Sequence, residues 1–272
     1  MSSSPPRLSL CLVVRDAAPD LRRTLASLEA QRHLLLTLPA EIVVVDGDSA
    51  DGSGQLAKRW GAHCGVPTTC HQQPPMGIYP AMNLAWQQAA GDWLLFINAG
   101  DLLLEASGLP ELLDAADREG IDSVQCAAAI FPPGWRWAAT SRQQPVSCHQ
   151  SLLYRRRLHQ RLGPYDERLG LCADVLLMGA IEGGHHRRVP LLLAATQVSP
   201  RNASRTFRRV RQDLERLQRH QIPLKPWPSP RQTLVVLWLE ERLGVSLSVW
   251  IRAAVDLLLG SRRLIRLPDA PL

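Results

Sequence analysis

The sequence lacks the features that mark several large classes of protein. Its six cysteines include no C-x-x-C pair, and a chain of 272 residues can bury a core without a disulfide or metal staple. We therefore expect a reduced, cytoplasmic protein without a zinc module. No apolar run reaches the roughly 18 residues of a membrane span. The apolar stretch at 8–14 has the length of a strand, which argues against a signal peptide.

Two common nucleotide-binding motifs are also missing. The chain contains neither G-x-x-x-x-G-K-S/T nor G-x-G-x-x-G, the glycine-rich loops of P-loop hydrolases and of dinucleotide-binding enzymes. The sequence therefore lacks the motifs that usually mark P-loop hydrolases and dinucleotide-dependent oxidoreductases. The sequence still allows a nucleotide site built from carboxylates and a metal ion.

Lysine is scarce, and the positive charge is unevenly spread. The 31 basic residues include only Lys58 and Lys225 as lysines, and the net charge is +6. Residues 1–200 carry 17 Arg/Lys against 19 Asp/Glu, and residues 201–272 carry 14 against 6. We expect a near-neutral body at 1–200 and a basic, partly amphipathic helical extension at 201–272.

Three interpretations of the extension stay open. Its Arg-rich and Trp-bearing helices could pack on the body, clamp a phosphate, or contact anionic lipid. The third would place the protein at the inner face of the membrane. Nucleic-acid binding is not expected, because no recognised nucleic-acid module accompanies the charge.

Hydrophobic patterning predicts an α/β body. Short apolar runs at 8–14, 41–45 and 92–97 are typical of strands buried on both faces, and helical spacing follows each of the first two. We expect the second of these helices to close at Gly61. Strands that alternate with helices pair in parallel through right-handed crossovers. The expected fold class is a mostly parallel sheet flanked by helices.

Polar clusters follow two of the predicted strands. Asp46 opens the stretch DGDSADGS, and Asn98 opens NAGD, which ends at Asp101. In an open α/β sheet, ligands bind beyond the carboxyl ends of the strands, where carboxylates suit a divalent cation or a nucleotide. Turn chemistry alone is the alternative for either cluster. Their joint occurrence at strand ends favours a binding site.

The order of these segments resembles the family 2 glycosyltransferases of the GT-A fold. The resemblance covers roughly residues 8–200. It includes the segments LSLCLVV (8–14), EIVVVDGDSADGS (41–53), GIYPAMN (77–83), GDWLLFINAGD (91–101), CHQSLLYRR (148–156) and LGPYDERLGLCADVLLM (162–178).

The resemblance implies transfer of a sugar, with inversion, from a UDP- or GDP-linked donor to a saccharide or lipid-linked acceptor. Such an enzyme would serve cell-surface polysaccharide or glycolipid synthesis. On the family's pattern, Asp46 matches the nucleoside-binding aspartate. The further residues assigned to the donor are Arg15, Gly77, Tyr79, Asn83 and Asn98.

The resemblance also implies a cation and a general base. Mg²⁺ or Mn²⁺ would neutralise the leaving diphosphate, with Asp101 and His149 as candidate ligands. Asn98 and Gly100 weaken the family's Asp-x-Asp motif, and a hydrogen-bonded structural histidine is the alternative for His149. Asp174 matches the base that takes the acceptor's proton. A helix N-cap is its alternative, and the two roles are compatible.

Several family positions differ in this chain. Arg15-Asp16 replaces a common Tyr-Asn pair, Pro75-Met76 replaces an acidic-basic pair, and Pro80 replaces an Asp. These changes permit an unusual donor, or a weakly active or inactive relative that binds a nucleotide sugar or a partner protein. A nucleotidyltransferase is a third possibility. Trp135 and Trp137 could stack on sugar rings or serve as ordinary strand residues.

Overall fold

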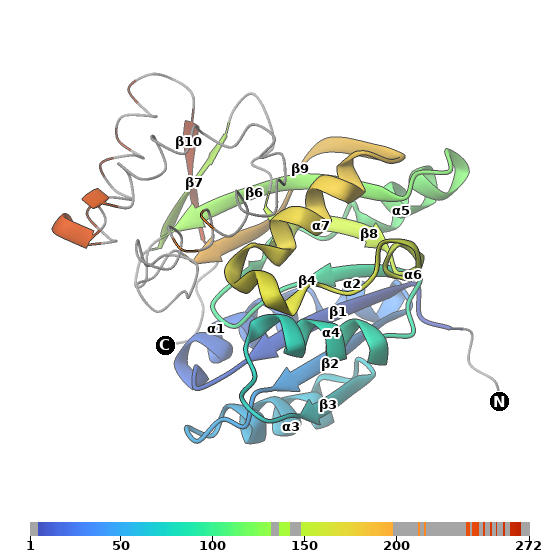
Figure 1. Cartoon of the computed structure of the whole chain (residues 1–272). Helices are drawn as coiled ribbons and strands as arrows, with labels where there is room; N and C mark the ends of the chain where they lie inside the picture. The colour runs from blue at the N-terminus through green and yellow to red at the C-terminus, as the bar shows by residue number, and fades with distance from the viewer. Residues whose placement is uncertain are drawn as a thin grey trace.

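The computed structural model of the chain describes residues 5–131, 136–141, 148–197 and 262–267, with single residues and short stretches between 212 and 258. Within them, one mixed sheet has helices on both faces (Figure 1). Its strands are β1 (Leu8–Val14), β2 (Ala40–Asp46), β3 (Thr68–Gln72), β4 (Trp93–Phe96), β5 (Leu102–Leu103), β6 (Ser123–Phe131), β7 (Trp137–Ser141), β8 (Leu152–Arg155), β9 (His186–Gln197) and β10 (Arg262–Arg266). The helices are α1 (Ala18–Ala30), α2 (Arg32–Thr37), α3 (Ser53–Cys64), α4 (Ile78–Gln88), α5 (Leu109–Arg118), α6 (Arg157–Leu162) and α7 (Ala173–Glu182), with 3₁₀ turns η1 (His149–Ser151) and η2 (Glu167–Cys172).

Four parallel strands form one half of the sheet, in the order β3-β2-β1-β4. The central strand β1 is buried on both faces because its side chains alternate between two cores. Leu8, Leu10 and Leu12 pack with α1, α2, α3 and α5, whereas Cys11 and Val13 pack with α4, α6 and α7. The expected parallel pairing is confirmed, and the apolar run 8–14 is a strand covered by helices on both sides.

The other half of the sheet is largely antiparallel. β8 pairs antiparallel with both β4 and β6, β7 pairs antiparallel with β6, and β9 pairs parallel with β6 and antiparallel with β5. The segment Arg262–Arg266, which was expected to belong to a helical extension, is the strand β10 on the edge of β7. Most of 201–261 lies outside the described residues. In the described parts, no helix is long and apolar enough to cross a membrane.

Most of the predicted elements are present, and two differences have clear causes. β3 was missed because its sequence, TTCHQ, has no apolar run. The helix expected to close at Gly61 continues to Cys64 and ends at Gly65, where φ is 76°. Gly61 is needed for close packing, since a Cβ there would lie 2.7 Å from Thr68 Cγ2. Gly61 therefore lies inside α3, where the absence of a side chain lets the helix pack against β3.

Candidate active site

The two polar clusters lie next to each other at one edge of the sheet. β1 and β2 end side by side, with Val14 paired to Asp46. The Ala99 N–H, in the loop after β4, donates to the Val13 carbonyl at 3.4 Å. Because parallel strands end at the same edge, segments that lie far apart in the sequence are neighbours here.

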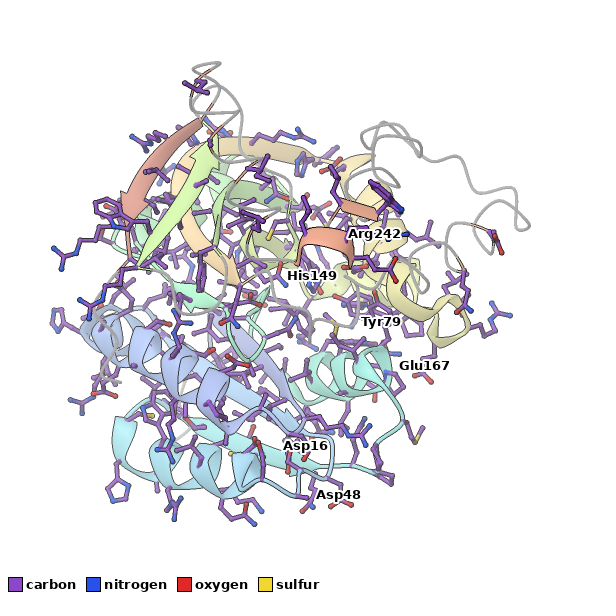
Figure 2. The ribbon with its side chains drawn as sticks, turned by 90° about the vertical axis from the view of Figure 1, so that its left-hand side faces the viewer. Asp16, Asp48, Tyr79, His149, Glu167 and Arg242 are labelled. Carbon is purple, nitrogen blue, oxygen red and sulfur yellow. The ribbon has the colours of Figure 1, made fainter. Side chains whose placement is uncertain are left out.

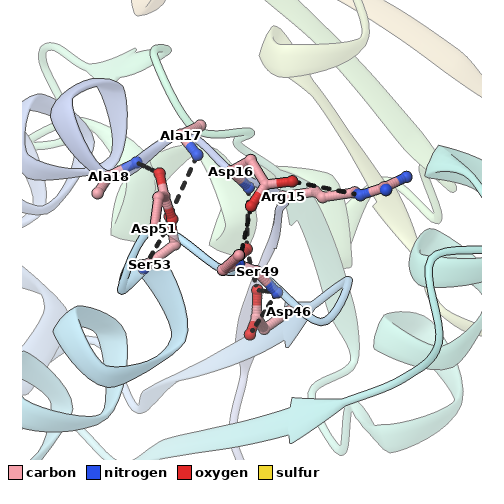
Figure 3. Close-up of polar contacts among 9 residues, drawn as sticks. Arg15, Asp16, Ala17, Ala18, Asp46, Ser49, Asp51 and Ser53 are labelled. Atoms are coloured by element: carbon pink, nitrogen blue, oxygen red, sulfur yellow. Dashed lines mark hydrogen bonds and ion pairs between the residues drawn. The ribbon is translucent and has the colours of Figure 1, made fainter.

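Asp46 is the last residue of β2, and its side chain faces the start of α3. Its carboxylate accepts hydrogen bonds from the hydroxyl and the backbone N–H of Ser49 (Figure 3). A Cβ at Gly54 would lie 2.4 Å from Asp46 Oδ2, so only glycine lets the carboxylate approach this turn. Asp46 is therefore held by its own loop, as expected of a side chain preorganised for a ligand.

The loops after β1 and β2 are tied together by hydrogen bonds. The Asp16 N–H donates to Ser49 Oγ at 2.9 Å, and the Ala50 N–H donates to Asp16 Oδ1 at 2.8 Å (Figure 3). Asp16 and Asp48 adopt positive φ values of 47° and 58°, which are uncommon outside glycine and concentrate at functional sites. These hydrogen bonds hold the two loops together at this edge of the sheet.

Asp51 completes the connection between these loops. Its carboxylate accepts from the Ala18 N–H at 2.7 Å and from the hydroxyl of Ser53 at 2.6 Å. Burial raises the pKa of Asp51, but the hydrogen bonds from Ser53 and Ala18 outweigh burial and leave the pKa below its usual value. The first turn of α1 is thus capped by a residue that follows β2.

Arg15 and Gly77 lie at the same edge. The Arg15 side chain packs over Gly47, whose Cβ would lie 3.4 Å from it, and its guanidinium lies 3.6 Å from Asp16. Half-exposed Arg15 brings a cationic side chain to the strand ends. Gly77 is the N-cap of α4 with φ 116°, a conformation that favours glycine.

Asp101 points into the protein. The backbone N–H groups of Asn98 and Gln197 donate to its two carboxylate oxygens at 3.2 and 3.3 Å, and the Gln150 side chain also bonds to it. Burial raises the pKa of Asp101 to about 7. Asp101 therefore joins the NAGD loop to the end of β9. Among the residues that the structure describes, none hydrogen-bonds to the buried Asn98 Oδ1, which leaves this oxygen to accept from a ligand.

His149 lies in η1, buried against Phe96 with ring centroids 5.2 Å apart. Its Nε2 is 2.8 Å from the hydroxyl of Tyr165, and burial lowers the pKa of His149 to about 4. The imidazole is therefore neutral at pH 7. His149 thus has the features of a hydrogen-bonded structural histidine, because it belongs to a buried hydrogen-bond network.

The predicted pair of metal ligands does not fit a cation. Asp101 directs both oxygens at N–H donors, and the described residues contain no group of three His, Cys, Asp or Glu side chains suited to a metal ion. Divalent cations need several oxygen or nitrogen ligands that face one point. Asp101 and His149 instead serve the protein's own hydrogen-bond network.

Asp174 lies in the first turn of α7, and Tyr79 orients its carboxylate. Asp174 Oδ1 accepts from the Tyr79 hydroxyl and from the Val175 N–H, both at 2.8 Å. Its own backbone N–H also bonds to the carboxylate, and the Tyr79 and Val175 bonds both leave Oδ2 unused. Burial raises the pKa of Asp174, and the hydrogen bond from Tyr79 opposes this rise. The carboxylate has one fixed oxygen and one available oxygen, as a general base requires.

Two residues assigned to the donor have other partners in the structure. Tyr79 holds Asp174 and stacks on Tyr165 with ring centroids 5.6 Å apart. Asn83 donates to the Tyr165 carbonyl and to Glu167, and it accepts from the Tyr165 N–H and the Trp86 indole. The side chain of Asn83 is fully used within the protein. It fixes the segment at 165–167 against α4.

The predicted residues fall into two groups. Figure 2 shows Tyr79 and His149, of one group, apart from Asp16 and Asp48 in the loops of the other. The end of β2 carries Asp46, and the loops after β1 and β4 carry Arg15, Asn98 and Asp101. The second group joins α4, η1 and α7 through Tyr79, His149 and Asp174. Gln150, next to His149, bonds to Asp101 and thereby connects the groups.

Sequence reasoning missed Ser49, Gln197 and Tyr165, the partners that hold Asp46, Asp101 and His149. Only Ser49 lies beside the residue it supports. Of the two tryptophans, Trp135 lies outside the described residues. Trp137 is 49% exposed on β7, opposite Arg266, so it is a strand residue with a free surface.

Comparisons with known proteins agree with this architecture. Among solved structures, S. aureus TarS 1–349 in complex with UDP has a TM-score of 0.57 at 18% identity, over 86% of this chain and 71% of that one. The mannosyltransferase PcManGT from Pyrobaculum calidifontis, in complex with GDP-Man and Mn²⁺, has a TM-score of 0.59 at 18% identity, over 95% and 80%. The sheet and its helices form a GT-A fold.

The family model for glycosyl transferase family 2 matches residues 9–171. The chain belongs to this family. A curated relative from Mycobacterium bovis, named PGL/p-HBAD biosynthesis glycosyltransferase, is 32% identical over 140 residues, 49% of this chain and 55% of the relative. The chain thus matches about half the length of such curated relatives.

Proposed function

We propose that the protein is an inverting glycosyltransferase that moves a sugar from a nucleoside-diphosphate donor to an acceptor hydroxyl. The carboxylate of Asp174 carries the proposal, since Tyr79 and Val175 hold Oδ1 and leave Oδ2 available. A raised pKa suits a base that must take a proton near neutral pH. Family membership supports the same reaction class.

In the proposed step, the acceptor oxygen attacks the anomeric carbon and its proton passes to Asp174 Oδ2. The bond from that carbon to the diphosphate breaks, and the nucleoside diphosphate leaves with the electron pair. Asp46 would accept hydrogen bonds from the nucleoside. Arg15 would meet the negative charge that grows on the diphosphate. The orphaned Asn98 Oδ1 would accept from the donor.

The donor class has support from the neighbours' bound ligands. Solved structures of TarS contain UDP or UDP-GlcNAc, and that of PcManGT contains GDP-Man. We propose a UDP- or GDP-linked sugar as donor and a saccharide or lipid-linked acceptor, as in polysaccharide or glycolipid synthesis. Contact with a membrane through 201–272 stays a prediction, because most of that segment lies outside the described residues.

The experiment is a transfer assay on the full chain with UDP-GlcNAc, GDP-Man and a panel of acceptors. Release of nucleoside diphosphate and NMR of the product's anomeric proton report transfer and stereochemistry. We expect release that requires acceptor and is lost in Asp174→Asn. A retained configuration would contradict inversion, and equal rates in Asp174→Asn would contradict the role of the base.

A second candidate is a relative that binds a nucleotide sugar without transferring it. The inward-facing Asp101 favours this alternative, because it leaves the weakened Asp-x-Asp motif without an open carboxylate. Donor binding without nucleoside diphosphate release, across the same panel, would support it.

A further inference from the structure

The three tyrosines of the chain, Tyr79, Tyr154 and Tyr165, gather in one buried cluster with two histidines. Four hydrogen bonds run in series through it. His149 Nε2 is 2.8 Å from the Tyr165 hydroxyl, which is 3.0 Å from the Tyr154 hydroxyl. The Tyr154 hydroxyl is 3.0 Å from His159 Nε2, and His159 Nδ1 is 3.1 Å from the Gly163 carbonyl.

The carbonyl at the far end sets the direction of every bond in this series. A carbonyl only accepts, so His159 Nδ1 must carry the proton. Burial lowers the pKa of His159 to about 4, and a neutral imidazole has one protonated and one bare nitrogen. His159 Nε2 is therefore bare, and the Tyr154 hydroxyl donates to it.

The same logic continues toward His149. Burial holds the pKa of Tyr154 and Tyr165 well above their usual value, so each hydroxyl has one proton to donate. Tyr154 uses its proton on His159 and accepts from Tyr165. Tyr165 thereby uses its own proton and accepts from His149. His149 must carry its proton on Nε2, which leaves Nδ1 with a lone pair.

The position of His149 relates this lone pair to the candidate site. Its ring packs on Phe96, two residues before Asn98. On the other side, Tyr165 stacks on Tyr79, which holds Asp174. His149 therefore lies between the donor motif and the proposed base. Its Nδ1 has no hydrogen-bond partner among the described residues.

We propose that the Tyr165–Tyr154–His159 series is a positioning device that fixes His149 in the Nε2–H form, so that Nδ1 accepts a hydrogen bond from a sugar hydroxyl. A bare nitrogen can only accept. It suits an O–H group and disfavours a phosphate oxygen, which also only accepts. The proposal rests on the proposed function only for the identity of the ligand, because the tautomer is a property of the free protein.

The first test is ring ¹⁵N NMR of the ¹⁵N-histidine-labelled full chain, with His149 assigned by the loss of its signals in His149→Gln. We expect a protonated Nε2 and a bare Nδ1. Tyr154→Phe removes an oxygen that does not touch His149. Tyr165 then loses its acceptor and turns its proton toward His149 Nε2, which should move the proton of His149 to Nδ1.

A matched control removes a buried hydroxyl elsewhere. Thr140→Val deletes the hydroxyl that donates to the Ala128 carbonyl at 2.9 Å, and it should leave the signals of His149 unchanged. The proposal is overturned if wild-type His149 carries its proton on Nδ1, if Tyr154→Phe keeps the wild-type tautomer, or if Thr140→Val changes it. The wild-type spectrum decides the first point even if Tyr154→Phe does not fold.

Binding measurements test the sugar contact. Tyr154→Phe should weaken binding of UDP-GlcNAc or GDP-Man by about fivefold, the loss of one neutral hydrogen bond, with binding of UDP and GDP unchanged. If the contact is to the acceptor, the KM of the acceptor rises instead. Equal losses for nucleoside diphosphate and nucleotide sugar would contradict a sugar contact. A wild-type chain that shows the expected tautomer but transfers no sugar would refute the proposed function alone.

Discussion

The two halves of the candidate site are held in different ways. On the proposed donor side, Asp46, Asp16 and Asp51 are fixed mainly by backbone N–H groups and by the hydroxyls of Ser49 and Ser53. On the side of the proposed base, Tyr79 and Asp174 are 95 positions apart and bond directly through their side chains. One half depends on loop geometry and the other on tertiary packing of helices.

This difference has a functional consequence. The loops after β1 and β2 are held by several separate hydrogen bonds, so variants there should alter binding with little effect elsewhere. The hydrogen-bonded phenols and imidazoles influence one another's proton positions, and Tyr79 stacks on Tyr165 while it bonds to Asp174. Variants on that side should alter proton positions and turnover.

Loss of the base should have the largest effect. Asp174→Asn keeps the shape of the side chain and its contact with Tyr79 but cannot take a proton. We expect kcat to fall by about 10²- to 10⁴-fold, with the Kd for nucleoside diphosphate unchanged, measured by product release and by calorimetry. If the Kd for nucleoside diphosphate rose by as much as kcat fell, Asp174 would belong to the donor side, and the two halves would not differ as proposed.

The effect of Asp101 should appear in stability and its pH dependence. Its folded pKa of about 7 lies above the unfolded value of about 3.9. Between these values the folded state binds more protons than the unfolded state, so stability falls as pH rises from about 4 to 7. Three pKa units correspond to a contribution of up to about 4 kcal/mol.

Asp101→Asn should therefore remove this slope. The unfolding free energy of the wild type minus that of the variant should decrease between pH 4 and pH 7, as measured by urea unfolding. The response of donor binding to Mn²⁺ should be the same in both proteins. If the variant alone loses a response to Mn²⁺, Asp101 is a metal ligand after all.

The turn around Asp46 was easier to predict from the sequence than the packing around Asp174, for a physical reason. Turn residues such as Asp46, Gly47 and Asp48 lie close together in the sequence, so a pattern marks the turn, although the bond from the Asp16 N–H to Ser49 is not local. The role of Asp101 was harder to predict because its partner Gln197 lies 96 positions away. The position of Asp101 in the NAGD segment does not indicate that its carboxylate accepts from backbone N–H groups inside the protein.

The cluster of tyrosines had no local signal at all. Tyr154 lies in β8 and Tyr165 in the loop before η2, where Asn83 of α4 holds it, and the tertiary fold brings both beside His149. The resemblance to the family named Tyr79 as a donor residue, but the fold places its hydroxyl on Asp174. The parallel half followed from apolar runs, whereas strand β10 lay in a segment whose composition favoured helix.

Asp46 should control donor affinity. Asp46→Asn replaces the carboxylate with an amide that cannot accept through both of its side-chain atoms. Binding of UDP or GDP should weaken by about 10- to 100-fold, as expected for charge-assisted hydrogen bonds, with little change in kcat at saturating donor. The matched variant Ser49→Ala removes only the support of Asp46 and should weaken binding less. An unchanged Kd in Asp46→Asn would remove the nucleoside site from this edge.

The smallest effect should come from Tyr79→Phe, which keeps the stacking on Tyr165 and removes only the hydroxyl. That hydroxyl lowers the pKa of Asp174 against the rise caused by burial, so its loss should raise this pKa further. A base must be deprotonated to work, and activity falls as pH drops through its pKa. The acidic limb of the profile of kcat against pH should therefore move to higher pH, with kcat near neutral pH lower by about two- to tenfold. A limb that moves to lower pH would show that Tyr79 does not stabilise the charged form of Asp174. A lower kcat with an unmoved limb would show that Tyr79 acts only by placing α7.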